Sequence, residues 1–165
     1  MRAADVERIV CRVPQGEAAV ICEPWETKQS PATGHAARWS LPIAVAARLM
    51  EGKVDLATFE RTASDAVRTL ARRISWEPLA GARFPERFEA ELVCITENEN
   101  QSVRIDDVFG NHTRPPGAEA VLAKFRATAA RSLRSDAVAA LERAARELGA
   151  SRDLKALSAA LRQTT

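Results

Sequence analysis

Three polar side chains stand just before the most apolar segment of the sequence. His35, Arg38 and Ser40 precede LPIAVAARLMEG, which runs from Leu41 to Gly52. An imidazole, a guanidinium and a hydroxyl are groups that transfer protons or hold anions in enzyme sites. Each also has an ordinary role, because Ser40 suits a helix N-cap, Arg38 a surface ion pair and His35 an exposed loop. Both interpretations stay open from the residue types alone.

The cysteines and histidines are too widely spaced to predict a metal centre or a disulfide framework. Cys11, Cys22 and Cys94 are an odd number without a CxxC pair, and His35 is far in sequence from His112. Reduced and mostly buried thiols are typical of this pattern. We therefore expect no metal and no cofactor.

The composition argues against two classes of partner. The 24 Lys and Arg nearly cancel the 22 Asp and Glu, so the net charge of +2 attracts neither nucleic acid nor an anionic membrane strongly. The expected strands carry Glu89, Glu91 and Asp107, which would repel phosphate. The first residues, MRAADVERIV, do not resemble a secretory signal, and no apolar run is long enough to span a bilayer. We expect a cytoplasmic protein that binds neither nucleic acid nor membrane.

Alternating apolar and polar residues predict a small antiparallel sheet. The expected strands are DVERIVCRV, RISWEPL, FEAELVCIT and SVRIDDVF, and ENENQ forms the turn of a hairpin between the last two. The stretch from Pro14 to His35 has no clear period and is expected to be a long loop.

The segment from Leu41 to Glu51 is expected to be a helix that is apolar nearly all the way round. Only Arg48 is clearly polar before Glu51, Pro42 lies in the first turn, and Gly52 supplies a left-handed C-cap. A helix without a polar face must be covered on several sides, either by its own core or by another domain.

Further helices complete an α+β fold with a helical C-terminus. They are expected from Asp55 onwards with a break near Ser64, in AEAVLAKFRATAARSL, in DAVAALERAARELG, and in a last short helix capped by Ser151. The 165 residues suffice for one domain with a substantial core.

The order of these segments resembles the C-terminal domain of the MmgE/PrpD family. The family includes 2-methylcitrate dehydratase, cis-aconitate decarboxylase and iminodisuccinate epimerase. The resemblance spans 4–133 and rests on DVERIVCRV, ARWSLPIAVAARLMEG, DLATFERTASDAVRTLARRISW, FPERFEAELVCIT and FGNHTRPPGAEAVLAKFRATAA, in that order.

The resemblance implies a lid domain that closes over the active site of a larger helical domain, usually in a homodimer and without a metal. Residues 1–133 would form the α+β lid, and 134–165 would be helices that pack on it or on the missing helical domain. The family's catalytic histidines, aspartate and lysine match no position here. The resemblance therefore assigns no catalytic residue to this chain and implies that the isolated chain is inactive.

The resemblance also implies weak substrate-binding candidates near the apolar helix. The family pattern there is approximately Ala, Lys, Phe, Ser, Leu, Pro, Tyr, and this chain has ARWSLPI from Ala37 to Ile43. Arg38 keeps the cation and could face a substrate carboxylate, and Ser40 and His35 lie beside it. Ile43 replaces the tyrosine, so a phenolic donor is missing.

Two functional hypotheses follow. In the first, the chain is the lid of a lyase or isomerase that acts on a small polycarboxylate and needs a helical domain for activity. In the second, it is a stand-alone α+β interaction or oligomerisation module that has lost catalysis and buries the Leu41 to Met50 region in an oligomer.

Overall fold

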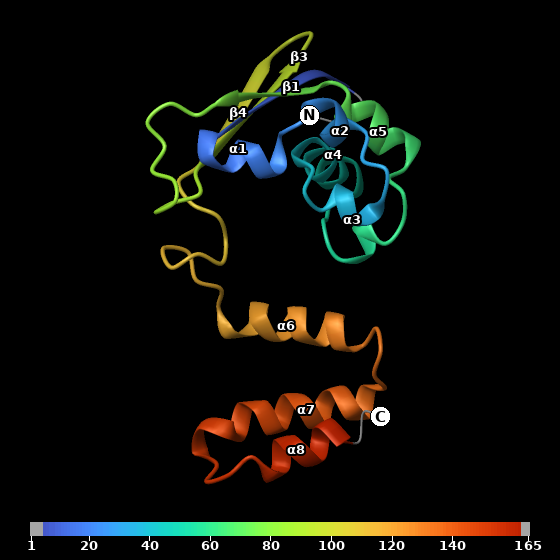
Figure 1. Ribbon diagram of the computed structural model, residues 1–165, viewed down its shortest axis with the longest axis vertical. Helices are drawn as coiled ribbons and strands as arrows, with labels where there is room; N and C mark the ends of the chain where they lie inside the picture. Colours follow the sequence, from blue (N-terminus) through green and yellow to red (C-terminus); the bar gives the residue numbers. More distant parts are fainter. Residues whose placement is uncertain (1–4, 163–165) are drawn as a thin grey trace. The chain divides into compact units, whose positions relative to one another are not determined.

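A computed structural model describes residues 5–162 of the chain. Four strands form one sheet in the order β2-β1-β3-β4 (Figure 1). Their bounds are β1 Val6–Val13, β2 Ile74–Pro78, β3 Ala90–Thr96 and β4 Asn100–Ile105. The expected hairpin is present, since the Thr96 amide donates to the Glu99 carbonyl at 3.0 Å and closes the β3–β4 turn.

The sheet is mixed, which corrects the expectation of a purely antiparallel sheet. β3 pairs antiparallel with β1 and with β4, but β2 runs parallel to β1. The chain between β1 and β2 is helical, and such a connection is long enough to return the chain to the same end of the sheet. The α+β class and the four strands are confirmed, but β4 begins at Asn100, inside the expected turn, and ends at Ile105, before the end of SVRIDDVF.

Eight α-helices are described. They are α1 Gln15–Ile21, α2 Trp25–Gln29, α3 Gly34–Ala37, α4 Leu41–Glu51, α5 Asp65–Ala71, α6 Ala118–Ala129, α7 Ser135–Glu147 and α8 Lys155–Arg162. The expectation of a long loop before residue 36 was wrong, because α1, α2 and α3 lie there. Helices of seven, five and four residues are too short to leave a visible period in the sequence.

Most of the helix boundaries that were expected from capping residues are confirmed. Ser64 Oγ accepts from the Val67 amide at 3.3 Å, so α5 begins at the predicted break after the 3-10 helix η2 (Ala57–Phe59). The last helix differs from the expectation. α8 begins at Lys155, whose amide donates to Asp153 Oδ1 at 2.9 Å, and Ser151 does not cap this helix.

The core lies between the sheet and α4 and α5. Ile9, Cys11 and Cys94 project from the helix-facing side of the strands, and Ile43 and Val67 are among the helix residues that meet them. A second buried cluster joins Val13 of β1 to Ala18 and Cys22 around α1. Figure 1 shows α1, α2, α4 and α5 on one side of the sheet.

The apolar helix α4 is only partly covered within this unit. Pro42, Ile43, Ala46 and Ala47 are buried, but the Met50 side chain is 42% exposed. Gly52 ends the helix with a φ of 74°, as its sequence position predicts.

Contacts divide the chain into two units, the first ending at Arg114 and the second beginning at Pro115. The second unit consists of α6, α7 and α8, with the 3-10 helix η3 (Leu148–Ala150) between the last two. Its own core is small, with Leu141, Ala144 and Ala160 buried and Phe125 and Leu157 packed against them. Helix α6 therefore belongs to the helical unit, whereas the sequence grouped it with the sheet. No helix within 5–162 has the length and apolar character of a membrane span.

Candidate functional site

The candidate residues His35, Arg38 and Ser40 lie where α3 ends and α4 begins. Thr33 Oγ1 accepts a hydrogen bond from the Ala36 amide at 3.1 Å and caps α3. Ser40 caps α4 in the same manner. Two capped helices therefore fix the backbone on both sides of Arg38.

Ser40 is a cap whose hydroxyl is fully engaged. Its side chain is buried, with 2% of its surface exposed. The oxygen accepts from the Ile43 amide at 3.2 Å, and the hydroxyl donates to the Lys28 carbonyl at 2.6 Å. Ser40 thus ties α4 to the end of α2 and holds its neighbours in place.

Arg38 and His35, in contrast, are exposed. Arg38 forms no side-chain hydrogen bond or ion pair within residues 5–162, although an acidic partner was one of its two expected roles. Trp39, between Arg38 and Ser40, has 52% of its surface exposed. An unpaired cation beside an exposed indole can hold a carboxylate.

Ile43 stands where the family resemblance implies a tyrosine. Its side chain is 2% exposed and packs in the main core cluster. An aliphatic side chain at this position contributes packing and cannot donate a hydrogen bond to a ligand.

The structure also brings together a polar cluster, centred on Asp107, that local sequence patterns do not predict. Asp107 is 1% exposed, and its carboxylate accepts from the Phe88 and Val108 amides at 3.0 and 2.9 Å. Asn111 Nδ2 donates to it at 2.9 Å, and Thr113 Oγ1 donates to its other oxygen. The sequence feature that could have indicated this cluster is the pair of polar residues Asn111 and Thr113 shortly after an expected strand.

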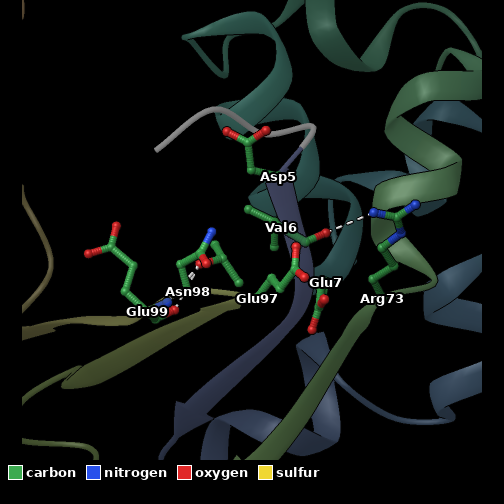
Figure 2. A pocket seen from close by; sticks show the side chains of 8 residues that line it. Asp5, Val6, Glu7, Arg73, Glu97, Asn98 and Glu99 are labelled. Carbon is green, nitrogen blue, oxygen red and sulfur yellow. Dashed lines mark hydrogen bonds between the residues drawn. The ribbon is translucent and has the colours of Figure 1, made fainter.

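A cavity lies elsewhere, at one end of the sheet. It has a volume of about 530 Å³ and is lined by Asp5, Val6, Glu7, Arg73, Thr96, Glu97, Asn98 and Glu99. Figure 2 shows the acidic side chains around it and Arg73, whose Nη1 donates to the Val6 carbonyl at 2.7 Å. This cavity contains none of the three candidate residues, and its carboxylates would repel a polycarboxylate.

The three cysteines are buried and unpaired by disulfides, as expected. Burial raises the pKa of Cys11 and of Cys22 to about 12, so both are thiols near neutral pH. Among the described residues, no group of three or more His, Cys, Asp or Glu is arranged to hold a metal ion.

The fold defines the class of this protein: an α+β domain with a mixed four-stranded sheet and a helical C-terminal unit. A family model described as the MmgE/PrpD C-terminal domain matches residues 1–149. The chain belongs to the MmgE/PrpD family and represents its C-terminal domain. A search of curated proteins finds no match. The matched region extends past Arg114 through α7, so both units contribute to the family domain.

Proposed function

We propose that this chain is the lid of an MmgE/PrpD-type lyase or isomerase, a dehydratase, decarboxylase or epimerase of a small polycarboxylate. It acts in the cytoplasm, in a homodimer, without a metal or organic cofactor, and together with a helical domain. The family membership supports the lid assignment.

The single observation that supports a carboxylate as the substrate class is the environment of the Arg38 side chain. Its guanidinium is exposed, has no partner within 5–162, and follows a backbone fixed by the Thr33 and Ser40 caps. An unpaired cation binds a carboxylate without first breaking an ion pair, and it stabilises negative charge that develops beside that carboxylate. His35, one helical turn earlier, would be a second polar contact.

The helical domain is proposed from the apolar surface around α4. Trp39, Met50, Val54 and Leu56 each have between 40 and 52% of their surface exposed. Trp39 precedes α4, and Met50, Val54 and Leu56 lie at or after its C-terminal end. Large exposed apolar residues are typical of a protein interface when they form one patch. A helical partner would cover the part of α4 that the first unit leaves open.

The isolated chain is proposed to be inactive because it contributes binding and closure without an acid or base. Removal of a proton beside a carboxylate needs a general base held within hydrogen-bond reach of that proton. The residues at the α3–α4 junction supply a cation and a capped helix, and the base would come from the helical domain.

The test is to mix the chain with the helical domain of an MmgE/PrpD protein, measure the mass of the mixture, and assay it on citrate-like and aconitate-like acids. We expect a complex and activity in the complex only. Arg38→Ala should lower kcat/KM roughly 10- to 100-fold through KM, and Arg38→Lys should restore part of it. Arg8→Ala, at an exposed arginine on the other side of the sheet, is the control. Absence of both complex and activity would refute the proposal.

Buried Ile43 favours a second candidate, a stand-alone interaction module that has lost catalysis. The position implied for a phenolic group carries a core side chain, so the chemistry associated with it is missing. This candidate predicts an oligomer that buries Leu41 to Met50. A Trp39→Asp variant that leaves the oligomer intact would argue against it.

A further inference from the structure

The short helix α2 links three other elements of the first unit. None of its residues is fully buried. Trp25, its first residue, packs against both core clusters of this unit, but its last turn is joined to α1, β2 and α4 by hydrogen bonds of Lys28 and Gln29. Figure 1 shows α2 beside α4. The place of this last turn therefore depends on polar contacts that single substitutions can remove.

The Lys28 side chain fastens α2 to the end of α1. Pro24 follows Val20 by four positions and has no amide hydrogen, so the Val20 carbonyl cannot complete its helical hydrogen bond. Lys28 Nζ donates to that carbonyl instead. A cation at the C-terminal end of a helix is also favoured by the helix dipole. The half-buried Lys28 thus satisfies a carbonyl that the sequence leaves without a helical partner.

The Gln29 side chain fastens α2 to the sheet. Its Nε2 donates to the Ile74 carbonyl of β2 at 3.4 Å, across 45 positions of sequence. The Lys28 carbonyl, one residue earlier, accepts from the Ser40 hydroxyl at 2.6 Å. A continuous set of contacts therefore runs from α1 and β2 through α2 to the N-cap of α4, two residues after Arg38.

We propose that Lys28 and Gln29 are positioning residues for Arg38. They hold α2 where its end accepts the Ser40 hydroxyl, and so they set the backbone from which the Arg38 side chain extends. This role rests on the proposed function of Arg38 and adds two residues whose side chains bond to Val20 and Ile74 instead. An arginine that extends from a defined backbone position loses less freedom when it binds a carboxylate. Loss of both contacts should weaken carboxylate binding and leave the chemical step unchanged.

Amide hydrogen exchange of the full chain tests this role without substrate. The Arg38 and Trp39 amides donate to α3 carbonyls at 3.2 and 3.1 Å, so their exchange reports how often this segment opens. In Lys28→Met/Gln29→Ala we expect both amides to exchange about 3- to 10-fold faster, with no change at the α5 amides. Thr27→Ala, at an exposed position of α2, is the matched control and should change neither.

Kinetics of the complex with a helical MmgE/PrpD domain test the consequence for binding. The double variant should raise KM about 3- to 10-fold at constant kcat. In an Arg38→Ala background the same two substitutions should raise KM no further, because the side chain that they position is absent. Lys28→Arg keeps a charged donor and should stay close to the wild-type KM.

The two measurements separate this role from the proposed function. Unchanged exchange at Arg38 and Trp39 in the double variant, equal acceleration at the α5 amides, or a KM rise of the same size with and without Arg38 would overturn the positioning role. An inactive wild-type complex would instead refute the proposed function, and the exchange rates alone would then decide whether α2 holds the backbone of Arg38.

Discussion

At the scale of single residues, the described part of the first unit has three buried polar side chains, Ser40, Glu89 and Asp107, and the hydrogen bonds of Ser40 and Asp107 organise the backbone around them. Ser40 joins the start of α4 to the Lys28 carbonyl. Asp107 gathers two amides and two side-chain donors just before the end of the first unit. A buried polar group without such partners would destabilise the fold, so each partner stabilises a specific local conformation.

Asp107 gives this unit a predictable response to acid. Burial by itself would raise the pKa of Asp107, but the hydrogen bonds from Thr113, Asn111, Phe88 and Val108 outweigh it and hold the pKa well below its ordinary value of 3.8. A carboxylate with a depressed folded-state pKa stabilises the fold fully above the unfolded-state value. That stabilisation is lost as the pH falls towards the folded-state pKa.

We therefore expect Asp107→Asn to lower the free energy of unfolding at pH 7, and the difference from the wild type to shrink as the pH falls below about 4. Urea unfolding at pH 7, 5 and 3, followed by tryptophan fluorescence, measures the loss of stability at pH 7 and how that loss changes with pH. Asp106→Asn, at the exposed neighbouring position, is the matched control and should change little. The same loss at all three pH values would show that the charge of Asp107 is not the cause.

At the scale of elements, α3 and η2 approach so closely that only glycine fits between them. A Cβ added at Gly34 would overlap the Phe59 carbonyl oxygen, which is part of the backbone and cannot move without shifting η2. A Cβ at Gly16 would instead meet the ring of Phe84, a side chain that is 37% exposed and can turn away. This packing sets the position of α3, and with it the approach to Arg38.

Gly34→Ala should therefore destabilise the first unit by about 1–3 kcal/mol, and Gly16→Ala by less. Chemical unfolding of both variants, with tryptophan fluorescence as the probe, gives the comparison. All three tryptophans, Trp25, Trp39 and Trp76, belong to the first unit, so the probe reports on the right part of the chain. An equal or larger loss in Gly16→Ala would contradict this account of the α3–η2 packing.

At the scale of the whole molecule, the two units have separate cores. The clusters of the first unit draw their residues from 6–94, and the cluster of the second unit draws its residues from 125–160. The buried apolar residues of the second unit within 5–162 are few, and most of them are small: Ala137, Val138, Leu141, Ala144 and Ala160. A helical unit this small buries little surface and gains little stability alone.

In the full chain we expect urea to unfold the second unit first. Far-ultraviolet circular dichroism should then show a loss of helix before the tryptophan signal changes. A shortened chain that ends at Arg114 should lack this early loss of helix. The urea concentration at the midpoint of its fluorescence change should equal that of the full chain. Coincident transitions by both probes in the full chain would instead show that the two units unfold together.

Part of this protein could be read from local sequence. The Ser40 and Ser64 caps, the Gly52 stop, the four strands and the family membership were all predictable, because each depends on neighbouring residues or on the order of motifs. The buried cap role of Ser40 was one of its two predicted roles. Whether Arg38 and His35 contact a substrate stays a prediction.

Other features were decided only when distant segments met in the tertiary structure. The parallel pairing of β2 with β1 joins residues more than 60 positions apart, and local periodicity does not specify the partner or direction of a strand. Helices α1 to α3 are too short to show a period. The buried Asp107 carboxylate accepts a hydrogen bond from the amide of Phe88, 19 positions earlier in the chain. Residues close together in the sequence determine helix caps and the periodicity of apolar side chains. Burial, strand order and the position of β4 at the edge of the sheet depend on contacts between segments far apart in the chain.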